Sequence, residues 1–90
     1  MLEGPLAYER QFVETKLALA DGLRRRREHL GLSQTQVARQ VGSSQSRVAK
    51  MEAADKTVST DLLLKCLFRL GASQRDVARL LTQASRTKAA

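Results

Sequence analysis

Apolar residues recur every three or four positions along most of the chain, a spacing that predicts helices. No segment shows a sustained two-residue alternation, so no strand is expected. Over residues 6–30 two neighbouring apolar stripes run along one predicted helix. The first holds Tyr8, Phe12, Leu19, Leu23 and Leu30, and the second holds Leu6, Val13, Leu17 and Ala20. Residues 1–5 are expected to be disordered, with Pro5 opening the helix.

Serine caps and glycine stops divide the remaining chain into four shorter helices. These are predicted over about 34–41, 45–52, 60–70 and 74–81, each after a serine that can accept a hydrogen bond from the first turn. Ser33 with Gln36, and Ser73 with Asp76, form capping boxes. The pattern therefore predicts an all-α fold of five helices, with residues 53–58 as the one long loop.

Composition limits what these helices can bury. Ninety residues form one short domain, and the aromatic residues are Tyr8, Phe12 and Phe68 alone. Leucine, valine and alanine must therefore supply most of the core, which favours packed helices over a β-sandwich. We expect the three aromatic side chains to lie in that core as well.

The charge is strongly basic and unevenly distributed. The formal net charge is +7. Residues 1–23 hold two bases and four acids, a net charge of −2, and residues 24–90 hold fourteen bases and five acids, a net charge of +9. A compact domain with this excess attracts polyanions, and nucleic acid is the foremost candidate. We expect residues 24–90, and not the first segment, to face it.

Few residues suit metal, redox or enzyme chemistry. Cys66 is the single cysteine and lies in an apolar helical run, so a buried structural thiol is expected. His29 has no cysteine or histidine at ligand spacing, so we expect a surface or helix-end residue and no metal. No catalytic set or phosphate-cradling glycine loop can be assembled, which predicts no enzyme and no cofactor. The chain has no apolar stretch of membrane-spanning length and no signal-peptide pattern, so a cytoplasmic location is expected.

The segments 34–41 and 45–52 have the pattern of two short helices joined at a sharp corner. Ala38 is small where the helices must touch, and Gly42 can adopt the positive φ angle that the turn needs. Val48 is one of four apolar residues spaced to point into a common core; the others are Val37, Val41 and Met51. The positions between them are polar. This combination predicts a helix-turn-helix.

At these residues the chain resembles the lambda-repressor/Cro-like (XRE) helix-turn-helix family. The resemblance covers about residues 23–70 and rests on the segments 30–34, 37–38, 41–46 and 48–52. Residues 52–59, with the leucine-rich helix that follows them, resemble XRE proteins of the antitoxin type. Ala54 stands where the family usually has glycine, so a differently shaped loop is expected there.

The second helix of such a motif lies in the major groove with its N-terminal residues at base edges. This geometry, and the resemblance, place Gln45, Ser46 and Lys50 toward bases, and Arg47 also points toward DNA. Glutamine can bond adenine N6 and N7 together, and lysine can donate to guanine O6 and N7. Phosphate contacts are expected from Gln34, Ser44 and Lys56, the first two at helix N-termini.

The run of arginines at 24–27 points around the whole circumference of a helix. Arg27 falls on the inner stripe with Leu23 and Leu30, so it needs a buried partner. The resemblance implies that this partner is Glu52, in a structural ion pair. Of the other three arginines, one or two are expected to face phosphates.

The leading hypothesis is a transcriptional regulator, most simply a repressor, that binds double-stranded DNA as a homodimer. The dimer contacts are expected either from the last helix (Val77, Leu80 and Leu81) or from the first (Phe12, Val13 and Leu17). The alternative is an antitoxin-type module that neutralises a toxin and represses its own promoter. RNA binding is disfavoured because no aromatic platform is expected. The predicted organisation is an N-terminal helical extension over 1–22, the helix-turn-helix domain with a C-terminal helix over 23–83, and a disordered tail over 84–90.

Overall fold

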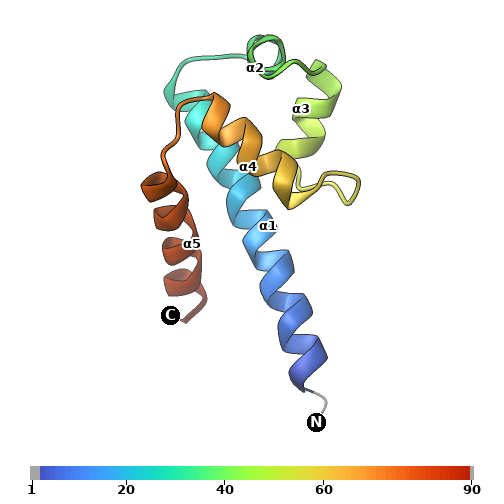
Figure 1. Ribbon diagram of the computed structural model, residues 1–90, viewed down its shortest axis with the longest axis vertical. Coiled ribbons are helices and arrows are strands. Elements are labelled where there is room, and N and C mark those ends of the chain that lie inside the picture. The colour runs from blue at the N-terminus through green and yellow to red at the C-terminus, as the bar shows by residue number, and fades with distance from the viewer. Residues whose placement is uncertain (1–2, 90) are drawn as a thin grey trace.

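The computed structural model describes the backbone of residues 3–89 and the side chains of residues 7–83. The described backbone is all-helical, as the sequence predicts. Its elements are α1 (Glu3–His29), α2 (Gln34–Val41), α3 (Gln45–Glu52), α4 (Thr60–Arg69) and α5 (Gln74–Ala89). Helix α1 runs along the long axis of the molecule, α2 and α3 form a corner at one end, and α4 and α5 pack against α1 (Figure 1).

The predicted caps are present. The Ser33 hydroxyl accepts a hydrogen bond from the Gln36 backbone N–H at 3.1 Å, and Gln36 Oε1 accepts one from the Ser33 N–H at 2.8 Å. Ser73 and Asp76 form the same reciprocal pair before α5. Hydrogen bonds from the backbone and hydroxyl of Ser73 lower the pKa of Asp76. The starts of α2 and α5 are therefore determined by local sequence.

The core is aliphatic. Its largest fully buried side chains are Leu19, Leu23, Val37, Val48, Met51, Leu63 and Leu67. Cys66 is buried beside Met51, and this burial raises the pKa of its thiol. The prediction of core aromatics is wrong, because Tyr8, Phe12 and Phe68 are all exposed. Tyr8 and Phe12 belong to the N-terminal half of α1, whose first turns extend past the ends of α4 and α5 (Figure 1).

Helix α1 begins at Glu3, so residues 3–5 are helical and not disordered as predicted. It continues without a break through residue 22, as the single helix predicted over residues 6–30 requires. Leu19 and Ala20, from the predicted extension, belong to the core. Gly22 allows α5 to approach, because a Cβ atom there would overlap the Leu80 side chain.

Two side chains of α1 hold the rest of the chain in place. Arg26 donates from Nε to the Leu70 carbonyl at the end of α4, at 2.8 Å. Lys16 Nζ donates to the Asp55 carbonyl in the loop after α3, also at 2.8 Å. Helix α5 extends to Ala89, and the disordered tail over 84–90 stays a prediction. No helix in the described part of the chain combines the length and apolarity needed to cross a bilayer.

Ala54 adopts a backbone conformation that normally favours glycine. Its φ is +55°, and the hydrogen bonds Ala54 N to Met51 O and Asp55 N to Lys50 O close the end of α3 around it. The loop therefore keeps a left-handed turn although alanine stands in place of the usual glycine, and the Cβ atom of Ala54 is strained. Thr57 donates both its backbone N–H and its hydroxyl to Asp55 Oδ1, and these bonds lower the pKa of that carboxyl.

Ala54→Gly is expected to stabilise the protein by about 0.5–1 kcal/mol, because glycine adopts this φ without the Cβ penalty. Chemical denaturation followed by circular dichroism measures the change. Gly42→Ala is the matched opposite, since it introduces a Cβ at φ +70° and should destabilise. A destabilised Ala54→Gly variant would show that the methyl contact of Ala54 with the core outweighs its strain.

Candidate nucleic-acid interface

Helices α2 and α3 meet at a corner built on Ala38 and Gly42. Gly42 has φ +70° and ψ +44°, the left-handed conformation, and Ser43 N donates to the Ala38 carbonyl at 2.8 Å. Ala38 and Val48 are buried where the two helices join the core. The chain therefore turns at Gly42, and α3 begins in a new direction with Ser44 as its N-cap.

The polar side of α3 faces solvent. The four residues predicted to read bases are all exposed: Gln45, Ser46, Arg47 and Lys50. Val48 and Met51, on the opposite side of the same helix, are fully buried. A helix that is buried on one side and polar on the other, at the edge of the molecule, is free to enter a DNA groove.

Gln34 contacts Gln45, a link that sequence reasoning missed. Gln45 donates from Nε2 to Gln34 Oε1 at 2.7 Å, and Gln34 donates from Nε2 to Glu52 Oε1 at 3.0 Å. The sequence interpretation treated Gln34 as a phosphate donor only. In the structure its amide also joins the first residue of α3 to the last. The sequence feature that could have suggested this bond is that Gln34 and Gln45 each follow an N-cap serine at the corner.

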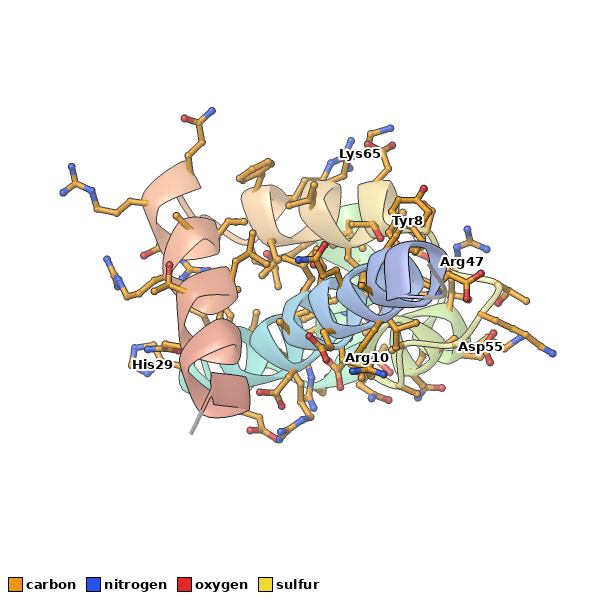
Figure 2. All side chains as sticks on the ribbon, turned by 90° about the horizontal axis from the view of Figure 1, so that it is seen from below. Tyr8, Arg10, His29, Arg47, Asp55 and Lys65 are labelled. Carbon is orange, nitrogen blue, oxygen red and sulfur yellow. The ribbon has the colours of Figure 1, made fainter. Side chains whose placement is uncertain are left out.

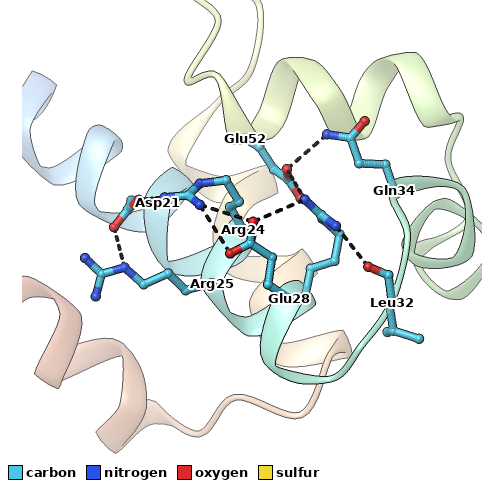
Figure 3. A network of polar contacts seen from close by, with 8 residues as sticks. Asp21, Arg24, Arg25, Glu28, Leu32, Gln34 and Glu52 are labelled. Atoms are coloured by element: carbon cyan, nitrogen blue, oxygen red, sulfur yellow. Dashed lines mark hydrogen bonds and ion pairs between the residues drawn. The ribbon is translucent and has the colours of Figure 1, made fainter.

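Arg27 and Glu52 form the ion pair that the resemblance implies (Figure 3). Arg27 donates from Nε to Glu52 Oε2 at 2.6 Å and from Nη2 to Glu52 Oε1 at 3.1 Å. A further bond from Arg27 to the Leu32 carbonyl fixes the connection before α2. The Glu52 side chain is 4% exposed and that of Arg27 is 15% exposed. The hydrogen bond to Glu52 raises the pKa of Arg27.

The other arginines of the 24–27 run are also engaged within the protein. Arg24 pairs with Asp21 and Glu28, and Arg25 pairs with Asp21 (Figure 3). Arg26 caps α4. Their guanidinium groups are therefore directed to partners in the fold, which reduces the support for phosphate contacts from this run. His29 is exposed in the last turn of α1, as expected, and no metal-ligand group occurs among the described residues.

The basic side chains around α3 differ from the arginines of the 24–27 run. Within the described residues, Arg39, Arg47, Lys50 and Lys56 have no acidic partner at ion-pair distance, and all four are exposed. Seven exposed basic side chains in the described part of the chain lack such a partner, and these four of them lie at the α2–α3 corner and the loop after α3; the others are Arg10, Arg69 and Arg75. Such a surface favours binding of a polyanion.

A hollow of about 300 Å³ lies beside the N-terminus of α3. Its lining brings together four residues predicted from sequence and two that were missed: Ser44, Ser46, Arg47 and Lys50, with Thr57 and Val58. The Ser44 hydroxyl accepts a hydrogen bond from the Arg47 N–H at 3.2 Å, so capping already uses this group. Gln34 and Gln45 are not part of this lining. The interface therefore has two parts, an amide pair and a basic hollow.

This corner, with its exposed polar helix and its basic side chains that lack acidic partners, defines a helix-turn-helix, a DNA-binding fold. The chain matches the family described as "Helix-turn-helix domain" over residues 18–81. It belongs to that family. No curated protein and no solved structure matches the chain.

Proposed function

We propose that the protein is a sequence-specific transcriptional regulator that inserts α3 into the major groove. The observation that carries this proposal is an exposed α3 bordered by four basic side chains without acidic partners, whose first residue is already oriented by a neighbouring helix. A repressor is the simplest regulator of this kind, because occupying a promoter needs no further surface. The proposed location, at the DNA in the cytoplasm, follows from this role.

The amide of Gln45 is suited to adenine. One of its two N–H groups is used by Gln34, which leaves one donor and the Oε1 acceptor. Adenine presents N7 as an acceptor and N6 as a donor in the major groove, so the remaining pair is complementary. Gln34 fixes the amide before binding, which lowers the entropy lost on contact. Lys50 and Arg47 are proposed to read guanine, with Ser46 beside them.

The phosphate contacts are proposed to lie on either side of the exposed face of α3. Ser44 and Gln34 lie at the N-termini of α3 and α2, where backbone N–H groups also point outward. Lys56 extends the positive surface into the loop. A single motif of this size touches few base pairs, so a homodimer on a two-fold site is proposed.

An antitoxin role is the second candidate. The exposed apolar residues of α1 favour a protein contact outside the DNA face, and such a contact is compatible with repression. RNA binding is not favoured, because Tyr8 and Phe12 lie on the half of α1 that extends away from the α2–α3 corner (Figure 1).

Selection of bound sequences from random double-stranded DNA tests the proposal. Wild-type protein is expected to enrich a two-fold repeat with half-sites about one helical turn apart. Gln45→Ala and Lys50→Ala should each lose about 1–3 kcal/mol of discrimination at one base pair of each half-site. Arg10→Ala, on the far part of α1, is the control and should enrich the same sequence. Failure to enrich any sequence, or unchanged preference in both α3 variants, contradicts the proposal.

A further inference from the structure

The N-terminal half of α1 carries exposed apolar side chains on a helix that continues past the domain body. Tyr8, Phe12, Val13 and Leu17 are 72%, 61%, 54% and 52% exposed. We refer to these four residues as the α1 apolar face. Within the same helix, Leu19, Ala20 and Leu23 are almost completely buried. Figure 1 shows that the first turns of α1 extend past the ends of α4 and α5.

Part of the α1 apolar face continues the stripe that forms the core. Phe12 and Leu19 are seven residues apart, two helical turns, and therefore lie on the same side of the helix. Figure 2 shows Tyr8 on the side of α1 toward α4, with Arg10 on the opposite side. Tyr8 and Phe12 are thus apolar and lie on the same side of the helix as core residues, but they are exposed. Exposed apolar patches of this kind mark interaction surfaces.

We infer that the α1 apolar face is the surface through which two copies of this chain pair. The inference rests on the homodimer of the proposed function and assigns its interface. Charge selects this surface over α5. Residues 3–17 contain three acids and two bases, a net charge of −1, whereas residues 74–89 contain one acid and four bases, a net charge of +3. Pairing through α5 would bring two positive helices together, and pairing through α1 would not.

The available area fits a weak dimer. The four side chains expose roughly 400 Å² in each copy, judged from the usual size of such residues. Two copies would bury about twice this area, which is less than the about 1,200–2,000 Å² that stable specific interfaces bury. We therefore expect weak pairing.

The position of the face leaves the DNA interface free. The N-terminus of α1 and the α2–α3 corner lie at opposite ends of a molecule 46 Å long (Figure 1). A partner bound to the first turns of α1 does not cover Gln45, Arg47 or Lys50. Both copies can thus pair and present α3 at the same time.

Sedimentation velocity of the full chain without DNA, from about 1 µM to about 300 µM, tests the inference. Wild-type protein is expected to shift from monomer to dimer, and the Tyr8→Ser/Phe12→Ser double variant to pair at least about tenfold more weakly. Leu30→Ser is the matched control, since Leu30 is 45% exposed just beyond the other end of α1 and should have no effect. Circular dichroism checks that each variant is folded.

Three results would overturn the inference. They are a wild-type protein that stays monomeric throughout, a double variant that pairs as wild type does, and pairing lost only in an α5 variant such as Leu81→Asp. Binding of a DNA duplex containing one selected half-site separates the two claims. If the monomer binds it, only the α1 interface is refuted. If wild-type protein binds no selected DNA, the proposed function fails whatever the oligomeric state.

Discussion

Glu52→Ala is expected to destabilise the protein by about 3 kcal/mol, because it leaves the Arg27 guanidinium largely buried without its counter-charge. In a domain of this size such a loss lowers Tm by roughly 10–20 °C. The same substitution removes the group that holds Gln34, so Gln45 loses its orientation as well. Thermal unfolding followed by circular dichroism measures the first effect. DNA affinity measured well below Tm reports the second.

Two controls separate a buried pair from an ordinary surface pair. Asp61→Ala breaks the exposed Asp61–Lys65 pair and should change Tm by no more than about 5 °C. Replacing both charges, in Arg27→Met with Glu52→Leu, should recover most of the stability lost in the single variant, because no uncompensated charge remains. A Glu52→Ala variant as stable as Asp61→Ala would show that the Arg27–Glu52 pair does not hold α1 to α3.

Affinity for DNA is expected to fall about 10³- to 10⁴-fold between 50 and 200 mM salt, as for six to eight phosphate contacts made by a dimer. The physical reason is that condensed counterions are released when lysine and arginine side chains of the protein neutralise DNA phosphates. Fluorescence anisotropy on a selected duplex measures the slope of log K against log salt. Lys56→Ala should reduce that slope by about one for each phosphate contact it removes.

Arg24→Ala is the matched control for the salt series. Arg24 is also a basic residue with a partly exposed side chain, but it is paired with Asp21 and Glu28. Its removal should leave the salt slope unchanged. A flat response in wild-type protein, or equal slope changes in the Lys56 and Arg24 variants, would argue against a phosphate surface centred on the loop and α3.

The parts of the fold that depend on local sequence could be predicted. A capping box such as Ser33 with Gln36 needs only residues three positions apart, and the Gly42 turn needs only its own backbone freedom. Burial was predicted less well. Tyr8 and Leu23 share an apolar stripe, but α4 and α5 cover only one of them, and the spacing of apolar residues does not show where a covering helix ends.

The exposure of the polar α3 side chains could be predicted from the sequence, but the hydrogen bond that links Gln45 to Gln34 could not. The residues of α3 follow from helical geometry once the corner is recognised. The Gln34–Gln45 bond depends on side-chain conformations at the meeting of two helices, which no single segment specifies. The conformation of Ala54 could not be predicted for a different reason. Its position in a hydrogen-bonded helix end imposes a left-handed φ on a residue that seldom adopts it.

We propose α3 and its flanking loop as the DNA surface, and a titration of ¹⁵N-labelled protein with a selected duplex, followed at each backbone amide by NMR, tests this assignment. We expect the largest shift changes at residues 44–50, with smaller ones at residue 34 and at 56–57. Shift changes that are largest on α5 or in the first turns of α1, with residues 44–50 unmoved, would refute the assignment.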